Sequence, residues 1–198
     1  MADTITALLA GRRGHFQMES GYHGGAWFDL DALFDHPDKL RPFVAELARR
    51  LSSHGAEVVC GPMTGGAKLA ELIAIELDVA HLVADRFETP KATGLFPVTY
   101  RIPEAERHIV RGRSVAIVDD AISAGSAVRG TYKDLIACGA RPVALGALIV
   151  FGDAAAAFAT QTGLALEGIE RKPLDMWHPA QCPLCKAGVA VETVSGRG

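Results

Sequence analysis

The chain has 198 residues, of which 49% are hydrophobic and 22% charged, with a formal net charge of −3 at pH 7. This composition predicts one folded domain, argues against disorder, and includes no dense basic block for nucleic acid. No apolar stretch of about 18 residues is free of charges, so we expect no membrane span. Four cysteines do not make a disulfide scaffold in a chain this long, and no signal peptide is visible. A cytoplasmic location is therefore expected.

The first half of the chain predicts two short strands, at 15–21 and 27–30, separated by glycines. Residues 41–54 then repeat apolar side chains with helical spacing, and a buried strand follows at 57–60. A glycine-rich turn leads from that strand into a second helix, which is expected to end at about Leu77.

The turn before this second helix is a candidate phosphate site. Backbone N–H groups at the start of a helix attract anions, because they are unpaired and lie at the positive end of the helix dipole. Thr64, Gly65 and Gly66 supply such groups here. The alternative is a plain connection between a strand and a helix.

The second half of the chain alternates predicted strands with predicted helices. A strand at 79–84 precedes a segment at 86–111, whose prolines and alternating side chains predict a β-hairpin flap. Further strands are expected at 115–118, 143–151 and 164–169, with helices between them. This order predicts an α/β fold in which helices flank a parallel sheet.

The most informative stretch is 115–126, where four apolar residues run into Asp119 and Asp120 and then into a turn of small residues. The turn and the helix behind it form a cradle for an anion, and Gly125 can take a positive φ there. Carboxylates repel phosphate, so the acids should face the vicinal hydroxyls of a sugar, directly or with a magnesium ion nearby. The pattern predicts a sugar phosphate ligand. The alternative is a solvated strand end in which an aspartate caps the helix.

This stretch resembles the phosphoribosyl-pyrophosphate (PRPP) motif of type I phosphoribosyltransferases, and its continuation through Val128 and Arg129 is similar to the orotate phosphoribosyltransferases. The resemblance implies a glycosyltransferase that moves ribose 5-phosphate from PRPP to a nucleobase with Mg²⁺. For orotate, the products are orotidine 5′-phosphate and pyrophosphate, a step of pyrimidine biosynthesis. The resemblance also implies a homodimer.

Site residues follow from the same resemblance. The family's two acids bind the ribose 2′- and 3′-hydroxyls, its loop binds the 5′-phosphate, and a second turn binds pyrophosphate. The two acids are Asp119 and Asp120, which are also catalytic and Mg²⁺-binding candidates. The remaining PRPP-binding positions are Ala121, Ile122, Ser123, Ala124, Gly125, Ser126, Ala127, Thr64, Gly65 and Gly66.

Residues 16–21 are similar to a segment that lies near the base in orotate phosphoribosyltransferases. That similarity makes Phe16, Ser20, His23 and Phe28 the predicted base-binding residues. An ordinary surface hairpin is the alternative interpretation of this segment.

Basic residues on the flap are also implied, because the family uses them to meet the leaving pyrophosphate. Arg86 matches the first of these by position, and Lys91 lies near a later one. Both are predicted catalytic residues, with a solvated charge as the alternative. The family's usual lysines are replaced by His23, Gly65 and Phe87, so cations are lost near the base or the pyrophosphate.

Three functions therefore stay open at this point. The chain is an orotate-type transferase, a transferase for another base, or a non-catalytic regulator that binds PRPP. A regulator usually carries a DNA-binding helical unit or a basic RNA surface, and the sequence shows neither.

The tail after residue 175 contains a Cys-Pro-Leu-Cys sequence that has the spacing of a metal-binding pair. Zinc bound by His178, Cys182 and Cys185 is one interpretation, with a fourth ligand from His23, Cys60 or a dimer mate. A packed or exposed thiol pair is the other. We expect a phosphoribosyltransferase-like domain at 1–175, with its flap at about 86–111, followed by a C-terminal tail at 176–198.

Overall fold

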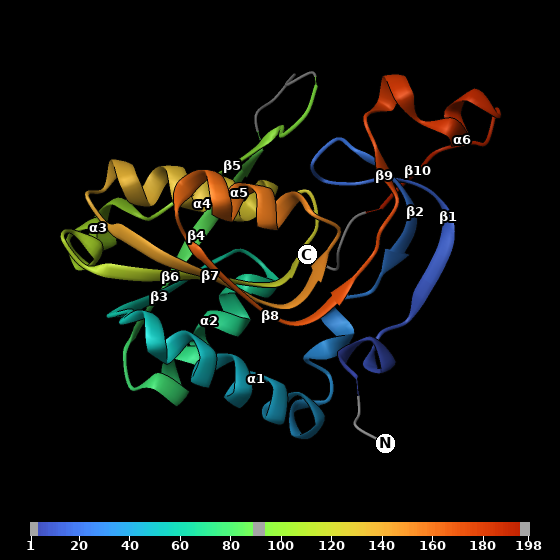
Figure 1. Cartoon of the computed structure of the whole chain (residues 1–198). Helices are drawn as coiled ribbons and strands as arrows, with labels where there is room; N and C mark the ends of the chain where they lie inside the picture. Colours follow the sequence, from blue (N-terminus) through green and yellow to red (C-terminus); the bar gives the residue numbers. More distant parts are fainter. Residues whose placement is uncertain (1–3, 89–93, 195–198) are drawn as a thin grey trace.

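The computed structural model describes residues 4–88 and 94–194, and in this part of the chain the main sheet has six strands (Figure 1). The strands lie in the order β5-β4-β3-β6-β7-β8. Neighbours from β4 to β8 run parallel, whereas β5 pairs antiparallel with β4. The predicted parallel sheet is thereby confirmed. Its strands are β3 (Val58–Pro62), β4 (Ala80–Glu88), β5 (Val98–Arg101), β6 (Ser114–Ile122), β7 (Arg141–Phe151) and β8 (Ala165–Lys172).

Helices cover both faces of this sheet (Figure 1). One face packs against α1 (Pro37–Leu51) and α2 (Gly65–Leu77), and the other against α4 (Ser126–Ala137) and α5 (Ala154–Thr162). None of the helices among the described residues is long and apolar enough to cross a membrane. The shorter helical segments are η1 (Ile5–Leu8), η2 (Asp31–Leu33), η3 (Ser52–His54), η4 (Glu104–Glu106), α3 (Arg107–Val110), η5 (Pro179–Gln181) and α6 (Pro183–Lys186).

Strand β6 shows why this sequence forms a buried parallel sheet. Val115 and Ile117 belong to the apolar cluster beneath α4 and α5, whereas Ala116 and Val118 belong to the cluster beneath α1 and α2. All four side chains are fully buried. A strand that is buried on both faces needs a continuous apolar run, and this is the pattern that predicted the strand.

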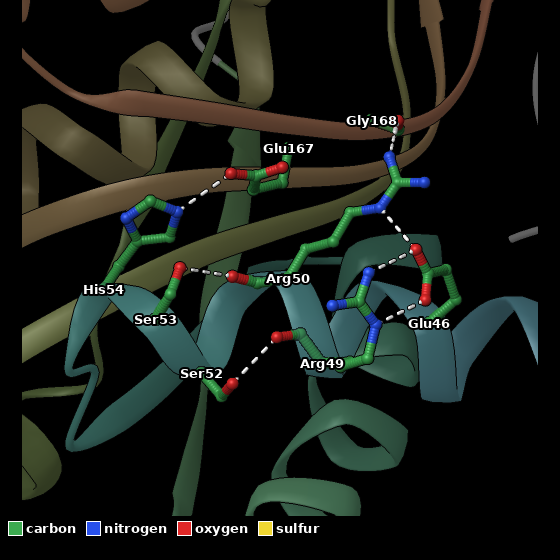
Figure 2. Close-up of polar contacts among 8 residues, drawn as sticks. All are labelled: Glu46, Arg49, Arg50, Ser52, Ser53, His54, Glu167 and Gly168. Atoms are coloured by element: carbon green, nitrogen blue, oxygen red, sulfur yellow. Dashed lines mark hydrogen bonds and ion pairs between the residues drawn. The ribbon is translucent and has the colours of Figure 1, made fainter.

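Polar contacts fasten the end of α1 to the edge strand β8 (Figure 2). Arg50 donates one hydrogen bond to the carbonyl of Gly168 over 2.8 Å and another to Glu46, also over 2.8 Å. His54 Nε2 lies 2.9 Å from Oε1 of Glu167. These contacts fasten the helix to the edge of the sheet.

A second, smaller sheet stands beside the main one and joins the two ends of the chain (Figure 1). We call it the hood sheet; its order is β10-β1-β2-β9. Strand β10 pairs parallel with β1, and β9 pairs antiparallel with β2. The division of the chain at residue 175 stays a prediction. The hood strands are β1 (Gly11–Gln17), β2 (His23–Phe28), β9 (Met176–Trp177) and β10 (Glu192–Thr193).

Several element boundaries differ from the sequence prediction, and two of them bear on the site. Strand β6 continues past the acids to Ile122, because its pairing with β7 continues to the Ile122–Val150 pair. The predicted flap is an antiparallel hairpin of β4 and β5 only as far as Arg101. Ile102 and Val110 are buried in the core, so the later part of the predicted segment packs against the body of the protein.

Candidate active site

The acid pair lies near the C-terminal end of β6, where parallel sheets place their ligand sites. Asp119 and Asp120 are 9% and 8% exposed, so they are not a solvated strand end. Oδ1 of Asp120 accepts a hydrogen bond from the N–H of Ala121 over 2.7 Å. Burial and then the charge of Asp120 raise the pKa of Asp119, and burial raises the pKa of Asp120 to about 6. Two carboxylates buried side by side gain from hydrogen-bond donors or a cation placed against them.

The glycine turn between β3 and α2 packs directly against these acids. A Cβ on Gly65 would overlap the carboxylate of Asp120, and one on Gly66 would lie 2.8 Å from Oδ1 of Asp119. Thr64 occupies the N-cap of α2 without a side-chain cap, so the first N–H groups of this helix stay open to a ligand. Glycine is therefore required in this turn, the first of two anion cradles, where it meets the acid pair.

The second cradle is the start of α4. Gly125 is its N-cap and has a φ of 78°, a conformation that glycine adopts without strain. No side chain caps this end of the helix, so its first N–H groups are available to an anion. Ser123 and Ser126 line the same cleft and add hydroxyl donors.

Both cradles and the acid pair open into one cleft of about 280 Å³. The main sheet supplies its floor, and the turn between β1 and β2 supplies part of its wall. The remaining wall comes from the segment after β2 and from Tyr100 on β5. The lining residues that the sequence did not single out include Met18, Glu19, Trp27, Asp29, Leu30, Asp31, Met63, Tyr100 and Val194.

The hood and the β4–β5 hairpin touch each other beside this cleft. Glu19, in the hood turn, accepts hydrogen bonds from the hydroxyl of Tyr100 at 2.6 Å and from Nε of Arg86 at 3.0 Å. The N–H of Phe96 donates to the carbonyl of Ser20 over 2.8 Å. Burial and then the charge of Glu19 raise the pKa of Tyr100, so the phenol stays a donor.

A family model of the phosphoribosyl transferase domain matches residues 30–169, which hold the acid pair and both cradles. The chain belongs to this family. The match covers most of the chain and excludes the first hood strands and the tail. The predicted phosphoribosyltransferase, a glycosyltransferase, is thereby confirmed.

Curated relatives of this phosphoribosyltransferase carry the name orotate phosphoribosyltransferase. The protein of that name from Thermotoga maritima is 29% identical over 185 residues, covering 93% of this chain and 91% of the relative. Another, from Caldanaerobacter subterraneus subsp. tengcongensis, is 26% identical over 179 residues and covers 89% and 86%.

Solved structures share the phosphoribosyltransferase fold. An orotate phosphoribosyltransferase from Aeropyrum pernix has a TM-score of 0.62 at 17% identity, covering 83% of this chain and 88% of the other. An adenine phosphoribosyltransferase from Rhodothermus marinus has a TM-score of 0.66 at 16% identity, covering 85% and 96%. Similar scores for two named activities mean that the likeness concerns the fold and not the base.

The predicted base-binding residues divide into two pairs. Ser20 and Phe28 line the cleft, and the ring of Phe28 stacks on Phe151 with centroids 5.1 Å apart. Phe16 is 2% exposed and His23 is 8% exposed, and neither lines the cleft. They point to opposite faces of the hood sheet, because His23 pairs with Gln17 and side chains alternate along a strand, and the turn that reaches the cleft begins only after Gln17.

The predicted flap cations have different surroundings. Arg86 is held by Glu19 and by Glu88, whose Oε1 lies 2.8 Å away. Burial alone would lower the pKa of Arg86, but its hydrogen bonds to the two carboxylates outweigh this effect and raise it. Lys91 lies outside the described residues. Lys68 was missed in the sequence: its positive charge acts on Asp120, and its Nζ lies 3.1 Å from Asp31.

The tail brings together a set of metal-binding side chains that agrees with the prediction at Cys182, Cys185 and the proposed fourth ligand His23, but has His15 in place of His178. Cys182 and Cys185 lie with His15 and His23, and the four ligand atoms are all within 4.8 Å of one another. His178 is not in this group; its Nδ1 accepts a hydrogen bond from the N–H of Ala180. The expected role for His178 is thus corrected, since the short segment Pro179–Gln181 turns its side chain toward the local backbone.

Proposed function

We propose that this phosphoribosyltransferase transfers ribose 5-phosphate from PRPP to orotate, which releases pyrophosphate and forms orotidine 5′-phosphate. One observation carries the PRPP part of the proposal: two uncapped helix starts and the acid pair open into one cleft. A ligand with two phosphate-bearing ends and a diol between them matches that arrangement. The names of the relatives at 26–29% identity support orotate as the acceptor.

Each part of the site then has a role in the reaction. The start of α4 would hold the 5′-phosphate and the turn at Gly65 the pyrophosphate, while Asp119 and Asp120 accept hydrogen bonds from the ribose hydroxyls. Fixing the sugar between the two cradles aligns C1′ with the base nitrogen, and such positioning can supply about 7 kcal/mol or more. The N–H groups that face pyrophosphate meet the negative charge that builds as the C1′–O bond breaks.

The acid pair also suits Mg²⁺, which proteins bind through one or two carboxylates together with substrate phosphates. Asp119 and Asp120 are buried with raised pKa values, so they would gain from a cation in front of them. A bound Mg²⁺ would neutralise the phosphates of PRPP. Asp119 and Asp120 are the side chains that we propose for this role.

A second candidate acceptor is a base without a negative charge. The described side chains that line the cleft include the five carboxylates Glu19, Asp29, Asp31, Asp119 and Asp120, and no lysine or arginine. Orotate carries a carboxylate of its own, and like charges repel strongly at close range. A neutral pyrimidine or purine would avoid this repulsion.

The deciding experiment measures pyrophosphate release from PRPP and Mg²⁺ with orotate, uracil, adenine, guanine and hypoxanthine in turn. Turnover with orotate alone supports the first proposal, and turnover with a neutral base alone supports the second. Calorimetric titration with PRPP accompanies the screen. PRPP binding without turnover on any base would favour a PRPP-binding regulator, and no PRPP binding would overturn the whole proposal.

The expected homodimer and the cytoplasmic location stay predictions. A dimer has a physical rationale here, because the acidic cleft must bind an anionic ligand, and the family's basic loop often reaches the partner's site. Light scattering during gel filtration would measure the mass of the particle and test the dimer.

A further inference from the structure

We propose that His15, His23, Cys182 and Cys185 bind one zinc ion and so fasten the C-terminal tail to the hood. The four residues come from both ends of the chain: the histidines lie on β1 and β2, and the cysteines lie at and within α6. The inference concerns a site apart from the cleft, since none of the four lines it.

Four distances between the ligand atoms are close to those of a tetrahedral centre, and all four atoms lie within 4.8 Å of one another. Sγ of Cys182 lies 3.4 Å from Nε2 of His15, and Sγ of Cys185 lies 3.3 Å from Nδ1 of His23 and 3.7 Å from Nε2 of His15. Zinc bonds of about 2.3 Å to sulfur and about 2.0–2.1 Å to nitrogen put tetrahedral N and S ligands about 3.6 Å apart. The two ring nitrogens are 2.9 Å apart and would separate by a few tenths of an ångström around the ion.

The hydrogen bonds at the site fix which atom of His15 faces the ion. Its Nδ1 lies 2.8 Å from the carbonyl of Val189, and a carbonyl can only accept, so Nδ1 carries the proton. Nε2 therefore presents a lone pair to the other three residues. A carbonyl that holds the far nitrogen in this way is the usual outer partner of a metal-binding histidine.

Without a metal, this arrangement leaves polar atoms poorly paired. One nitrogen from His23 and two sulfurs, from Cys182 and Cys185, all approach the single lone pair of His15 Nε2. A single lone pair accepts one good hydrogen bond, and His15, His23 and Cys182 are buried from water. One cation at the centre would satisfy all four atoms, and two thiolates would cancel its charge.

The ligand chemistry selects zinc, and the four protein ligands assign it a structural role. Two sulfurs and two imidazole nitrogens in a tetrahedron are typical of Zn²⁺, and four protein ligands leave no open position for chemistry. Cys182 and Cys185 have the spacing of a chelating pair, with Cys182 at the N-cap of α6. Both histidines stand at the base of the turn that brings Glu19 and Ser20 to the cleft. The ion would therefore hold that turn in place.

The test measures metal content in protein purified without chelators. We expect one zinc per chain in the wild type and in the control His178→Gln, and a loss of most of that zinc in Cys185→Ser and His23→Gln. Wild-type protein treated with a chelator should have a lower Tm that added zinc restores. Zinc retained in full by Cys185→Ser would overturn the proposal.

Cobalt(II) exchanged into the wild type keeps the test decisive if the variants fail to fold. We expect the strong visible absorption of a tetrahedral ion and a thiolate-to-cobalt charge-transfer band in the near ultraviolet. Weak absorption of an octahedral ion, or a Cys182–Cys185 disulfide in protein that lacks zinc, would contradict the proposal. Neither readout depends on PRPP turnover, so failure of the proposed function would leave this result unaffected.

Discussion

The cleft has two halves that differ in how far apart their residues lie in the sequence. The proposed PRPP half consists of the acid pair, the α4 cradle and the Gly65 turn, and the hood half consists of the hood residues that line the cleft. The acid pair and the α4 cradle come from one unbroken stretch at the end of β6, and the Gly65 turn is equally local. The hood joins His15 to Cys182, two residues that are 167 positions apart. In the proposed reaction the donor side is therefore built from residues close together in the sequence, whereas the acceptor side depends on contacts between the two ends of the chain.

Mutations in the two halves should therefore have different consequences. Changes in the PRPP half should act on the affinity for PRPP itself, since each residue there is held by its own strand or helix. Changes in the hood should act on the base, because Glu19, Ser20 and Trp27 reach the cleft from that side. The predictions below test this division, from the largest expected effect to the smallest.

Gly65→Val should lower the affinity for PRPP about 100-fold. Its side chain would occupy the place of the Asp120 carboxylate, and forcing the two segments apart costs roughly 3 kcal/mol. The matched control is Gly25→Ala on β2, where a Cβ would meet its nearest neighbour, the ring of Trp177, at 3.4 Å. Calorimetric titration with PRPP measures both variants. An unchanged affinity in Gly65→Val would contradict the proposal that the Gly65 turn and the acid pair bind PRPP together.

Asp119→Asn and Asp120→Asn should each lower PRPP affinity about 10-fold and leave the fold intact. Each change replaces a charged acceptor by a neutral one at the sugar, which costs about 1–3 kcal/mol. Thermal melts should show no loss of stability, since the buried pair carries mutual repulsion in the free protein. If both variants bound PRPP as the wild type does, the ribose would have to lie elsewhere.

Lowering the pH should weaken PRPP binding through the same acids. Burial raises the pKa of Asp120 to about 6, so its carboxylate is present above that pH and is lost as the pH falls through it. Between about pH 8 and about pH 5 the wild-type affinity should drop about tenfold. Phosphate groups titrate in the same range, so Asp120→Asn serves as the reference. Equal pH profiles for the two proteins would contradict the assignment.

Glu19→Gln should have the smallest effect, and it should change the KM for the acceptor base more than the affinity for PRPP. Glu19 accepts from Tyr100 and pairs with Arg86, and pairs that are this exposed are worth less than about 1 kcal/mol. We expect KM for the active base to change two- to fivefold at a nearly constant PRPP affinity. Steady-state kinetics measure this change. A larger effect on the affinity for PRPP than on the KM for the base would contradict the proposed division of the cleft into two halves.

The strands, helices and turns of the PRPP half could be predicted from the sequence because their determinants lie close together along the chain. Apolar runs that are buried on both faces indicated β3, β6 and β7, and the two acids, followed after Ala121 and Ile122 by Ser-Ala-Gly-Ser, indicated the cradle. The resemblance to type I phosphoribosyltransferases rested on that same stretch. The structure then placed Asp119 and Asp120 against Gly65 and Gly66, a contact between two separate motifs that were each found alone.

The hood could not be predicted to the same depth, because its partners are set by tertiary pairing. Spacing associated Cys182 and Cys185 with His178, which is near in sequence, and offered His23 as one of three sources of a fourth ligand. The folded chain brings in His23 together with His15, which the sequence did not single out as a ligand. Glu19 gave no local signal either, since its importance comes from Tyr100 and Arg86 on another sheet. A polar residue in a hairpin turn is ordinary until its partners are known.

The pairing of β10 with β1 also sets the order in which this protein can be completed during synthesis (Figure 1). All six strands of the main sheet have been made once Lys172 has left the ribosome, so the PRPP half can fold on a growing chain. The hood sheet has to wait for Glu192 and Thr193, which pair with Phe16 and Gln17. A nascent chain therefore contains the residues of both cradles before the hood sheet is complete. A chain that ends shortly after β8 contains both cradles and the acid pair and lacks β9 and β10 of the hood.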